Sequence, residues 1–540
     1  MRKLPTITPT MTDRLVGFFS PKAQVTRMAA RGQIMALTGG YTGASRRRRQ
    51  TKNWLTGGDS ADGALLPDLP ELRNRSRDLE RNNPLARGAL NTKVTNIVGT
   101  GLKPIPQIDA EALGLSPEEK EEKERALLRL WKVWAESAEC DLNRTNTFAE
   151  LQELVFRSVL RDGDVLVVKR FVERPGGPFG LKHQLIEADR LSNPNWQADT
   201  ARLSGGVETD RHGAPRAYHV TNTHPGDYGM KSRSLKWMRL RAFGPASGRR
   251  NVLHIFRRLR VGQSRGEPDL APVIEMIKQM GEYTDAEAQA AVVSAFFTVF
   301  VKSEGGSGFA PSSGTNGSGV SSTDANEVKL GQGAIVDLAP GEDIVSADPT
   351  RPNQAFDGFV LALARQIGTA LELPFEILIK HFTASYSAAR GALLEAWKYY
   401  RGRRRWLAQK YCQPTYEDVV IEAVARGMID LPGFFEDPFK HKAWLGADWY
   451  GDGMAQIDPK KENEADVIAE ERGWKTASEI TAEKTGGDFE QKIIQRGREE
   501  RLRKESGLAV TPQNKALPRP APKEPEPHPD QPEDETEDNS

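Results

Sequence analysis

Two pairs of carboxylates are the residues best placed to do chemistry in this 540-residue sequence. Asp162 and Asp164 flank one glycine, and Asp448 and Asp452 lie next to two others. Paired carboxylates can hold a divalent cation or exchange protons with a substrate. The first pair, however, lies between a helical pattern and a strand pattern, where Asp-Gly-Asp is typical of a turn. The second pair lacks the Asp-x-Asp-x-Asp-Gly spacing of a calcium loop, so we expect no metal site at either position.

Common signatures of enzymes and of zinc sites are missing. The sequence has no GxxxxGK loop for nucleotide phosphates, no HExxH helix and no CxxC pair. Its two cysteines, Cys140 and Cys412, are too few for a disulfide framework and fit a reducing compartment. His183, His219 and His254 fall in predicted strands, where a hydrogen-bonded structural histidine is more common than a metal ligand. We predict no catalytic residue, no metal and no cofactor.

Tyr386, Ser387 and Arg390 form a third group of reactive side chains. A serine nucleophile needs a neighbouring base, and no His or Lys lies at a helical partner position of Ser387. We interpret the group as a helix start, with Ser385 as the N-cap. Arg390 would pair with Glu395 or with a neighbouring subunit.

Charge is unevenly distributed along the chain, although the net charge is only +1. Residues 231–265 hold eleven Lys or Arg and no acid, whereas residues 516–540 hold eight acids and two bases. The basic stretch is either a solvated loop or a contact for phosphate or an acidic partner. The most apolar run, residues 290–301, is well short of the roughly 20 residues that span a bilayer, and the start of the chain lacks a signal peptide pattern. We therefore expect a soluble protein.

The stretch from Arg77 to Gln107 predicts a capped helix with an abrupt end. Asn83 can cap the helix, Pro84 suits its first position, and Gly99 and Gly101 can end it. Apolar residues recur at steps of four and three, the spacing of one buried face, and basic residues fall on the other side. The buried face comprises Ala86, Leu90, Val94 and Ile97, and the wet side carries Arg81, Arg87 and Lys93.

The following pattern predicts a mixed α+β domain. Ser116 with Glu119 and Thr147 with Glu150 form capping boxes, each of which begins a helix. Alternating apolar residues then predict short strands. These cover residues 164–171, 181–188, 216–221 and 252–257.

Two long helices flank a small β element in the second half of the chain. The first runs from Asp269 to about Lys302, and the second from Gln354 to Leu373, where Pro374 ends it. Between them, residues 303–326 contain seven Ser and six Gly, which predicts flexibility. Later residues are mostly helical, with helix starts near Asp458 and Thr476 and helix ends near Gly473 and Gly486. Residues 1–70 are expected to be a largely irregular arm. Residues 511–540 are expected to be disordered.

The run RNNP.ARGA…N.VGTG resembles the opening signature of the lambda-type portal proteins of tailed bacteriophages. It contains Arg81, Asn82, Asn83, Pro84, Arg87, Gly88, Gly99 and Gly101. Further segments resemble the same family in the same order, among them residues 184–195, 213–221, 252–268, 372–397 and 457–466. The resemblance covers roughly residues 70–505.

This resemblance implies a portal fold with the following parts: a basic arm (1–70), an α+β wing (71–266), a first stem helix (267–302), a β-containing clip with a flexible insert (303–352), a second stem helix (353–373), a tunnel loop (374–386), wing and crown helices (387–510) and an acidic, Pro-rich tail (511–540). On the tunnel loop, Lys380 and His381 would face double-stranded DNA, because exposed cations make weak, salt-screened contacts with phosphates.

The resemblance also implies a function and partners. About twelve copies would form a ring at one capsid vertex, closed by head-to-tail contacts. The ring would be the channel for DNA packaging and ejection, and would dock the large terminase subunit, the major capsid or scaffold protein and the head-tail connector. The protein would be assembled in the host cytoplasm and retained in the virion, without contact to a membrane. The alternative is a DNA-binding or DNA-processing enzyme without sequence specificity from the same packaging cluster.

Overall fold

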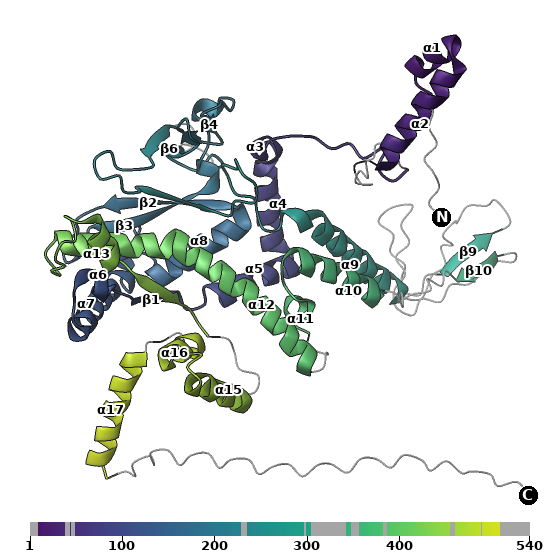
Figure 1. Ribbon diagram of the computed structural model, residues 1–540. Coiled ribbons are helices and arrows are strands. Elements are labelled where there is room, and N and C mark those ends of the chain that lie inside the picture. Colours follow the sequence, from purple (N-terminus) through teal and green to yellow (C-terminus); the bar gives the residue numbers. More distant parts are fainter. Residues whose placement is uncertain are drawn as a thin grey trace, which may run out of the picture. The chain divides into compact units, whose positions relative to one another are not determined.

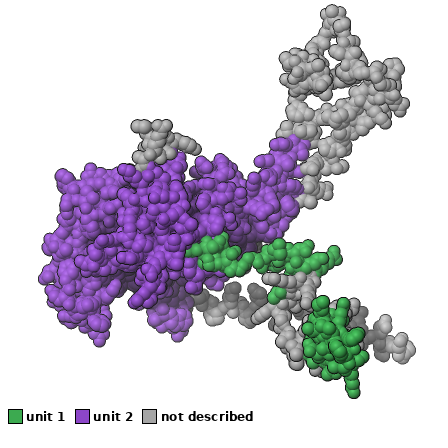
Figure 2. Space-filling view, turned by 90° about the horizontal axis from the view of Figure 1, so that it is seen from above, with its two compact units in different colours: residues 1–64 green, residues 65–540 purple. Residues whose placement is uncertain are grey.

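The computed structural model describes residues 9–37, 44, 49–227, 235–295, 299–303, 342–346, 356–381, 386–453, 459–485, 487 and 489–507. The chain divides into two compact units, residues 1–64 and 65–540, which Figure 2 shows in different colours. The acidic tail, nearly all of the Ser- and Gly-rich insert, and Ser385, Asp458 and Gly486 lie outside the described residues.

Two helices lie near the start of the first unit, so the prediction of a largely irregular arm is wrong for residues 11–37. They are α1 (Met11–Phe19) and α2 (Pro21–Leu37). A capping box begins α1: the Asp13 backbone N–H donates to Thr10 Oγ1, and the Thr10 backbone N–H donates to Asp13 Oδ2 at 2.9 Å. Arg31 of α2 pairs with the same carboxylate, which joins the two helices. This Thr-x-x-Asp signal was present in the sequence but was overlooked among the basic and Gly-rich patches.

The second unit is organised around a three-stranded antiparallel sheet of order β3-β2-β8. The strands are β2 (Asp164–Phe171), β3 (Leu181–Glu187) and β8 (Val252–Phe256), close to the predicted bounds. Alternate residues of β2 enter different cores. Val165 and Val167 belong to the main hydrophobic core, and Leu166 and Val168 to a smaller one. A strand that is buried on both faces explains the apolar run in the sequence.

The smaller core lies between this sheet and a four-stranded antiparallel sheet of order β4-β5-β6-β7. Its members come from both sheets, for example Leu166 and Ile186 from the first and Val207 and Tyr218 from the second. The strands of the second sheet are β4 (Leu203–Ser204), β5 (Val207–Thr209), β6 (Pro215–Thr221) and β7 (Trp237–Arg241).

Two helices of the main core, α7 and α8, begin at the capping boxes that the sequence predicts. Glu119 N–H donates to Ser116 Oγ at 3.2 Å, and Thr147 N–H donates to Glu150 Oε2 at 2.7 Å. Both capping boxes are therefore confirmed. The helices in this part of the chain are α3 (Ala61–Leu65), α4 (Leu69–Asn82), α5 (Pro84–Ile97), α6 (Ala110–Leu113), α7 (Pro117–Ala135) and α8 (Phe148–Asp162).

Two longer helices, α9 (Ile274–Ala295) and α10 (Phe356–Ala370), run side by side (Figure 1). The Tyr283 ring stacks on Phe356, with centroids 5.6 Å apart, and meets the edge of Phe359 at 5.0 Å. The predicted pairing of two long helices is therefore present within the second unit.

The predicted extension of the first long helix to Lys302 is wrong. Val299–Ser303 is a strand, β9, which pairs antiparallel with β10 (Glu342–Ser346). The run Val299-Phe300-Val301 has β-branched and aromatic side chains, which favour a strand once a partner strand is available. The partner lies in the region where the sequence predicts a small β element.

The rest of the second unit is mainly helical, as predicted. After the short helix α11 (Phe375–Ile379), the long α12 (Tyr386–Leu407) crosses the unit (Figure 1) and continues through a π-helical turn, Ala408–Cys412, into α13 (Gln413–Ala425). Then follow α14 (Pro438–Trp444), β11 (Ala447–Tyr450), α15 (Pro459–Glu471), α16 (Ala477–Thr485) and α17 (Phe489–Glu505), with β11 paired to β1 (Lys103–Pro106). None of the helices described is both long and apolar enough to cross a membrane. The α+β class predicted from the sequence is confirmed.

Candidate functional site

The segment predicted as a tunnel loop is only partly a loop. Residues 375–379 form α11, which lies against α5 and buries Ile377 and Leu378 in the main core. Two adjacent apolar side chains are enough to hold this single helical turn on the core. The prediction of a loop is therefore wrong for Phe375–Ile379, which form a helix packed on the main core. Lys380 and His381 follow directly after this helix.

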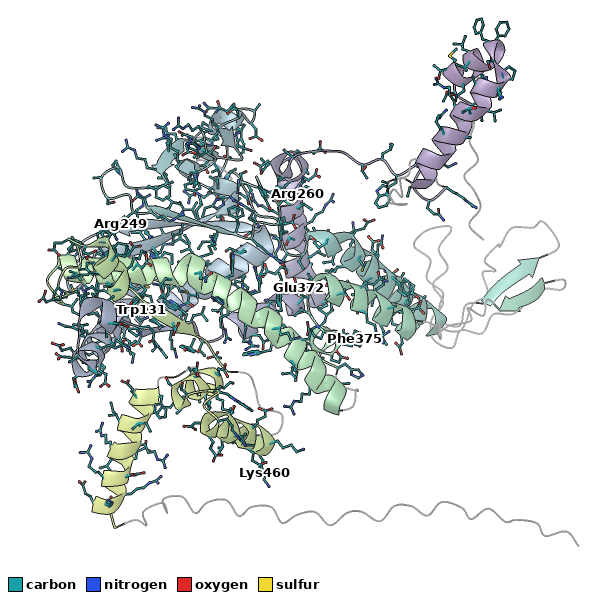
Figure 3. The ribbon with its side chains drawn as sticks, in the orientation of Figure 1. Trp131, Arg249, Arg260, Glu372, Phe375 and Lys460 are labelled. Carbon is teal, nitrogen blue, oxygen red and sulfur yellow. The ribbon has the colours of Figure 1, made fainter. Side chains whose placement is uncertain are left out.

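Both ends of this fixed segment have an unusual backbone. Glu372, labelled with Phe375 in Figure 3, has φ of 54° after α10, and Lys380 has φ of 55° after α11. The next residue in each case donates its N–H back across the turn, from Leu373 to Gly368 O at 2.9 Å and from His381 to Glu376 O at 3.1 Å. These are Schellman-type helix ends, where glycine is the usual residue. A left-handed side-chain-bearing residue costs of order 1–3 kcal/mol, so the surrounding contacts must hold these two turns in place.

Lys380 and His381 are both exposed. No hydrogen bond or ion pair among the described residues involves either side chain. The structure thus brings the two predicted residues together at the end of an anchored helix, with their polar groups open to solvent. Their contact with DNA stays a prediction.

The described part of α12 begins at Tyr386, and the role of Ser385 as its N-cap stays a prediction. Tyr386 and Ser387 occupy the first turn, although their side chains lie outside the described ones. Arg390 is half-buried, and Glu395 pairs instead with Lys398 at 2.9 Å. A separation of five residues places Arg390 and Glu395 on different faces of a helix, so this pairing was a wrong prediction. The alternative, a contact of Arg390 with a neighbouring subunit, stays a prediction.

The signature helix α5 has the predicted start and the predicted buried face. Asn83 Oδ1 accepts from the N–H groups of Leu85 and Ala86, each at 3.0 Å. Before it, Asn82 Nδ2 donates to Asp78 Oδ1 at 2.7 Å. The apolar face comprises Ala86, Leu90, Val94 and Ile97, all buried, and Arg81 and Arg87 are exposed as expected, while Gly88 leaves open space where a side chain would extend.

Lys93 corrects the predicted wet side of α5. Its side chain is 1% exposed and pairs with Asp269, which precedes α9. The Lys93 ammonium also lies 5.2 Å from the centre of the Tyr399 ring of α12. Since its carboxylate partner is 176 residues away in the sequence, periodicity alone could not reveal the pairing. Lys93 therefore connects α5 with the segment before α9 and with α12.

Arg404 and Asp452 hold the end of α5, a role that the sequence did not predict for either residue; Asp452 was considered only as part of a carboxylate pair. Arg404 of α12 donates from Nε to Ile97 O at 3.1 Å and from Nη2 to Asn96 O at 3.0 Å, so it caps the last carbonyls of the helix. The Asp452 carboxylate accepts from the Thr100 N–H at 2.7 Å and from its hydroxyl at 2.6 Å.

These contacts explain the glycines of the signature. Gly99 has φ of +56°, and a Cβ there would meet Asp452 Oδ2 at 2.1 Å. Gly101 has φ of +96°, and a Cβ there would meet the Ala149 Cβ at 2.6 Å. At the end of the signature, α5, α8, α12 and the segment after β11 therefore pack so closely that only glycine fits at Gly99 and Gly101. We call this set of contacts the α5 joint.

Asp164 is the centre of a buried ion network, not part of a metal pair. Its carboxylate accepts from Arg265 Nε at 2.5 Å, from Arg73 Nη2 at 2.9 Å and from His254 Nε2 at 3.0 Å. Burial opposes the charged form, but Arg265 and Arg73 outweigh it and hold the pKa of Asp164 well below its usual range. Asp162 is paired separately with Arg77 at 2.6 Å and with Arg161.

The three strand histidines are structural, as predicted. His183 Nδ1 lies 3.1 Å from the Tyr411 hydroxyl at the π-helical turn, and burial lowers the pKa of His183 to about 3. His219 lies 3.2 Å from Glu208, and His254 belongs to the Asp164 network. Among the described residues, no group of three or more His, Cys, Asp or Glu could hold a metal ion. Cys140 and Cys412 are both free and buried.

One motif was missed in the sequence. Gly262, Ser264 and Gly266 have the G-x-S-x-G spacing of a hydrolase nucleophile elbow. In such an elbow the serine lies on a sharp turn that joins a strand directly to a helix, whereas here a long non-helical loop separates Ser264 from both β8, which ends at Phe256, and α9, which begins at Ile274. Arg265 within it serves the Asp164 network, and a Cβ on Gly266 would meet Gly163 O at 2.0 Å. The spacing here reflects close backbone packing.

Comparison with known proteins gives the family. The family model described as "Phage portal protein, lambda family" matches residues 47–404, more than half of the chain. The chain belongs to the lambda family of phage portal proteins. The match includes the signature helix α5 and extends to Arg404, the residue that caps it.

Individual portal proteins are similar over a longer stretch. Portal protein B of Escherichia phage lambda is 27% identical over 85% of this chain and 89% of its own length. The portal protein of Escherichia phage N15 is 27% identical, again over 85% of this chain and 89% of its own. A probable portal protein of Halomonas phage phiHAP-1 is 24% identical over 78% of this chain and 79% of its own.

Solved structures with a resembling chain include necks of gene transfer agent particles. The neck of the native particle, computed with C12 symmetry, aligns with a TM-score of 0.40 and 15% identity over 77% of this chain and 92% of that one. The neck of the empty particle, computed with C6 symmetry, aligns with a TM-score of 0.41 and 15% identity over 86% and 100% of the two chains.

Proposed function

We propose that this portal protein forms a ring of about twelve copies at one vertex of the capsid, and that double-stranded DNA enters and leaves the head through the ring. The observation that carries the proposal is the match of residues 47–404 to the portal family. The protein acts mechanically, as a structural subunit without a catalytic centre. Its place is the mature virion, after assembly in the host cytoplasm.

The paired helices support the assignment of parts. We assign α9 and α10 to the stem, because they pack side by side through Tyr283, Phe356 and Phe359. The β9–β10 pair between them in sequence belongs to the clip, and the sheets and helices before α9 form the wing. The helices after α12 contribute to the wing and crown.

Lys380 and His381 are proposed as the DNA contact of the channel. Both are exposed, and α11 holds them on the core through Ile377 and Leu378. DNA of any sequence must pass, so the contact has to be weak and directed to phosphates. Cations on a short anchored segment suit this task better than groups that read bases.

The ring would dock three partners in turn. The major capsid or scaffold protein would surround it during head assembly, the large terminase subunit would bind while DNA is pumped, and the head-tail connector would bind afterwards. Each partner is an inference from the portal family.

A deletion experiment tests the function. A phage from which the gene for this chain has been removed should assemble heads without DNA, and expression of the chain in trans should restore full heads. Electron microscopy of the lysate and measurement of nuclease-protected DNA would show both results. Normal packaging without the chain would contradict the proposal, as would nuclease activity of the purified protein, which would favour a DNA-processing enzyme.

A further inference from the structure

Arg403 is a buried cation without a counterion. Arg403 lies on α12 and is 8% exposed. Its guanidinium lies 4.5 Å from the centre of the Trp406 ring and 5.9 Å from the centre of the Phe156 ring. Arg403 Nε has no hydrogen-bond partner, and no ion pair among the described residues joins this guanidinium to a carboxylate. Ring faces offset part of the cost of burying a charge, but they do not replace an acceptor.

Arg403 lines a pocket of about 230 Å³ between α8, α12 and the loop after β8. Neither of the two carboxylates that line this pocket forms an ion pair with Arg403 among the described contacts. Asp269 is paired with Lys93, and Glu267 makes no contact within ion-pair distance of the guanidinium. Arg257, the second cation of the pocket, has Glu372 at 3.7 Å, on the exposed side. The Arg403 guanidinium therefore has no ion-pair partner within the described part of the chain, and its buried Nε has no acceptor.

An ordered apolar tip lies beside the pocket. Leu259 lines the pocket and is 49% exposed, and Val261 at the turn is 99% exposed. The turn is held from within, because the buried Gln263 accepts with Oε1 from Leu259 N–H at 2.7 Å and from Arg260 N–H at 3.1 Å. Figure 3 labels Arg260 on this loop. A rigid turn that presents apolar side chains to solvent is typical of a surface that is covered in an assembly.

We infer that the Arg403 pocket receives an aspartate or glutamate side chain from a second copy of this chain, with Leu259 and Val261 packing around the same contact. The inference rests on the proposed ring, in which the interface between neighbours is heterologous, so that every subunit can offer a pocket on one side and a carboxylate on the other. A carboxylate on a guanidinium makes two parallel hydrogen bonds, which would supply the missing acceptors.

Size and charge favour a protein carboxylate over DNA. Val159, Leu160, Pro268 and Pro272 make much of the pocket wall apolar, which suits the carbon stem of an acidic side chain. The phosphates of a duplex lie on a cylinder far wider than this pocket and cannot enter it. The chain can supply the anion: Glu118 and Glu122 on α7, for example, are exposed and have no ion pair or hydrogen bond among the described contacts of their side chains.

The test is Arg403→Met in the full chain, with Arg405→Met as the matched control. Arg405 lies on the same helix but is exposed. Two quantities are measured for each protein: the concentration at which rings dissociate, by mass photometry of a dilution series, and the melting temperature of the dissociated subunit. For Arg403→Met we expect rings to dissociate at a concentration at least about tenfold higher, because the contact across the interface is lost. The melting temperature of the subunit should stay equal or rise, because an unpaired buried charge has been removed. Arg405→Met should change neither quantity.

Other outcomes overturn the inference in distinguishable ways. If wild-type and Arg403→Met rings dissociate alike, the pocket is not in the interface, while the proposed ring stands. A lower melting temperature of the variant subunit would show that Arg403 is a packing residue of the subunit itself. If inorganic phosphate raises the melting temperature of the wild-type subunit but not of the variant, and ring dissociation is unaffected, the pocket is a site for free phosphate. If the wild type forms no ring at all, the proposed function fails and this inference with it.

Discussion

Arg265 and Arg403 are both buried, but their surroundings are opposite. Arg265 donates to Asp164 and to three backbone carbonyls, those of Ala188, Leu191 and Gly205. Arg403 has aromatic rings beside it and no acceptor. The first arginine is satisfied within the subunit, and the second is not.

The difference separates the parts of the chain that fold the subunit from those that serve the assembly. The Asp164 network and the α5 joint are complete in one copy, since their donors and acceptors lie within the same unit. The Arg403 guanidinium and the exposed Lys380 ammonium have no charged partner among the described residues, and His381 lies exposed beside Lys380. Changes in the first class should alter the stability of the subunit, and changes in the second should alter what the ring does.

The largest effect is expected from Arg265→Met. The change leaves a buried carboxylate with one cation fewer and leaves three carbonyls without their donor, so the free energy of unfolding should fall by about 3–5 kcal/mol. Urea unfolding of the dissociated subunit measures it. Arg403→Met is the matched control, because the same substitution there removes no hydrogen bond. Equal losses from both changes would end the distinction between the two arginines.

Acid should reveal the Asp164 network next. The pKa of Asp164 is lower in the folded state than its unfolded value of 3.8. The carboxylate therefore stabilises the fold fully above pH 3.8, and this stabilisation is lost as the pH falls towards the lower pKa of the folded state. The free energy of unfolding of the wild type should therefore decrease below pH 3.8, and that of Asp164→Asn, lower at the outset, should decrease less. Parallel pH curves for the two proteins would show that Asp164 is not held as a carboxylate.

A smaller effect tests the α5 joint. Gly99→Ala should cost about 1–3 kcal/mol, because alanine at φ of +56° is strained and its Cβ would displace Asp452. Gly88→Ala, also within the signature, should instead stabilise the subunit by about 0.5–1 kcal/mol, since it lies inside α5 with open space around it. Melting temperatures of the two variants should shift in opposite directions. A loss at both positions would mean that the whole signature, and not only its end, is constrained by packing.

The smallest effect on stability is expected at the proposed DNA contact. Replacing Lys380 with Gly and His381 with Ala removes two exposed groups and relieves a left-handed lysine, so stability should stay within about 1 kcal/mol of the wild type or rise. Retention of packaged DNA should nevertheless change, and the change should depend on salt. Lys410→Ala, an exposed lysine elsewhere, is the control. Heads that package and keep full-length DNA normally with the double change would refute the role of these residues.

Local signals predicted the start of α5 and the two capping boxes, because Asn83, Ser116 and Thr147 bond to groups two or three residues away. Distant contacts escaped prediction. Lys93 was placed on the wet side because its partner Asp269 is far along the chain, and Arg404 reaches carbonyls 307 and 308 residues away. Likewise, Val299–Ser303 continues an apolar helical pattern but becomes a strand through its pairing with Glu342–Ser346.

The candidate site was also predictable only where local sequence signals locate it. The sequence located Lys380 and His381 between two helices, but α11 was not foreseen, since five residues give no periodicity. Arg403 could not be recognised at all, because three neighbouring arginines on α12 look alike in the sequence and only packing separates the buried one from Arg405.

The central claim is that the purified chain closes into a ring, and native mass spectrometry of the full-length protein tests it most directly. The account predicts one dominant species with the mass of about twelve 59.8 kDa subunits, and a central hole in negative-stain images of the same sample. Only monomers or dimers, at every salt and protein concentration tried, would contradict it.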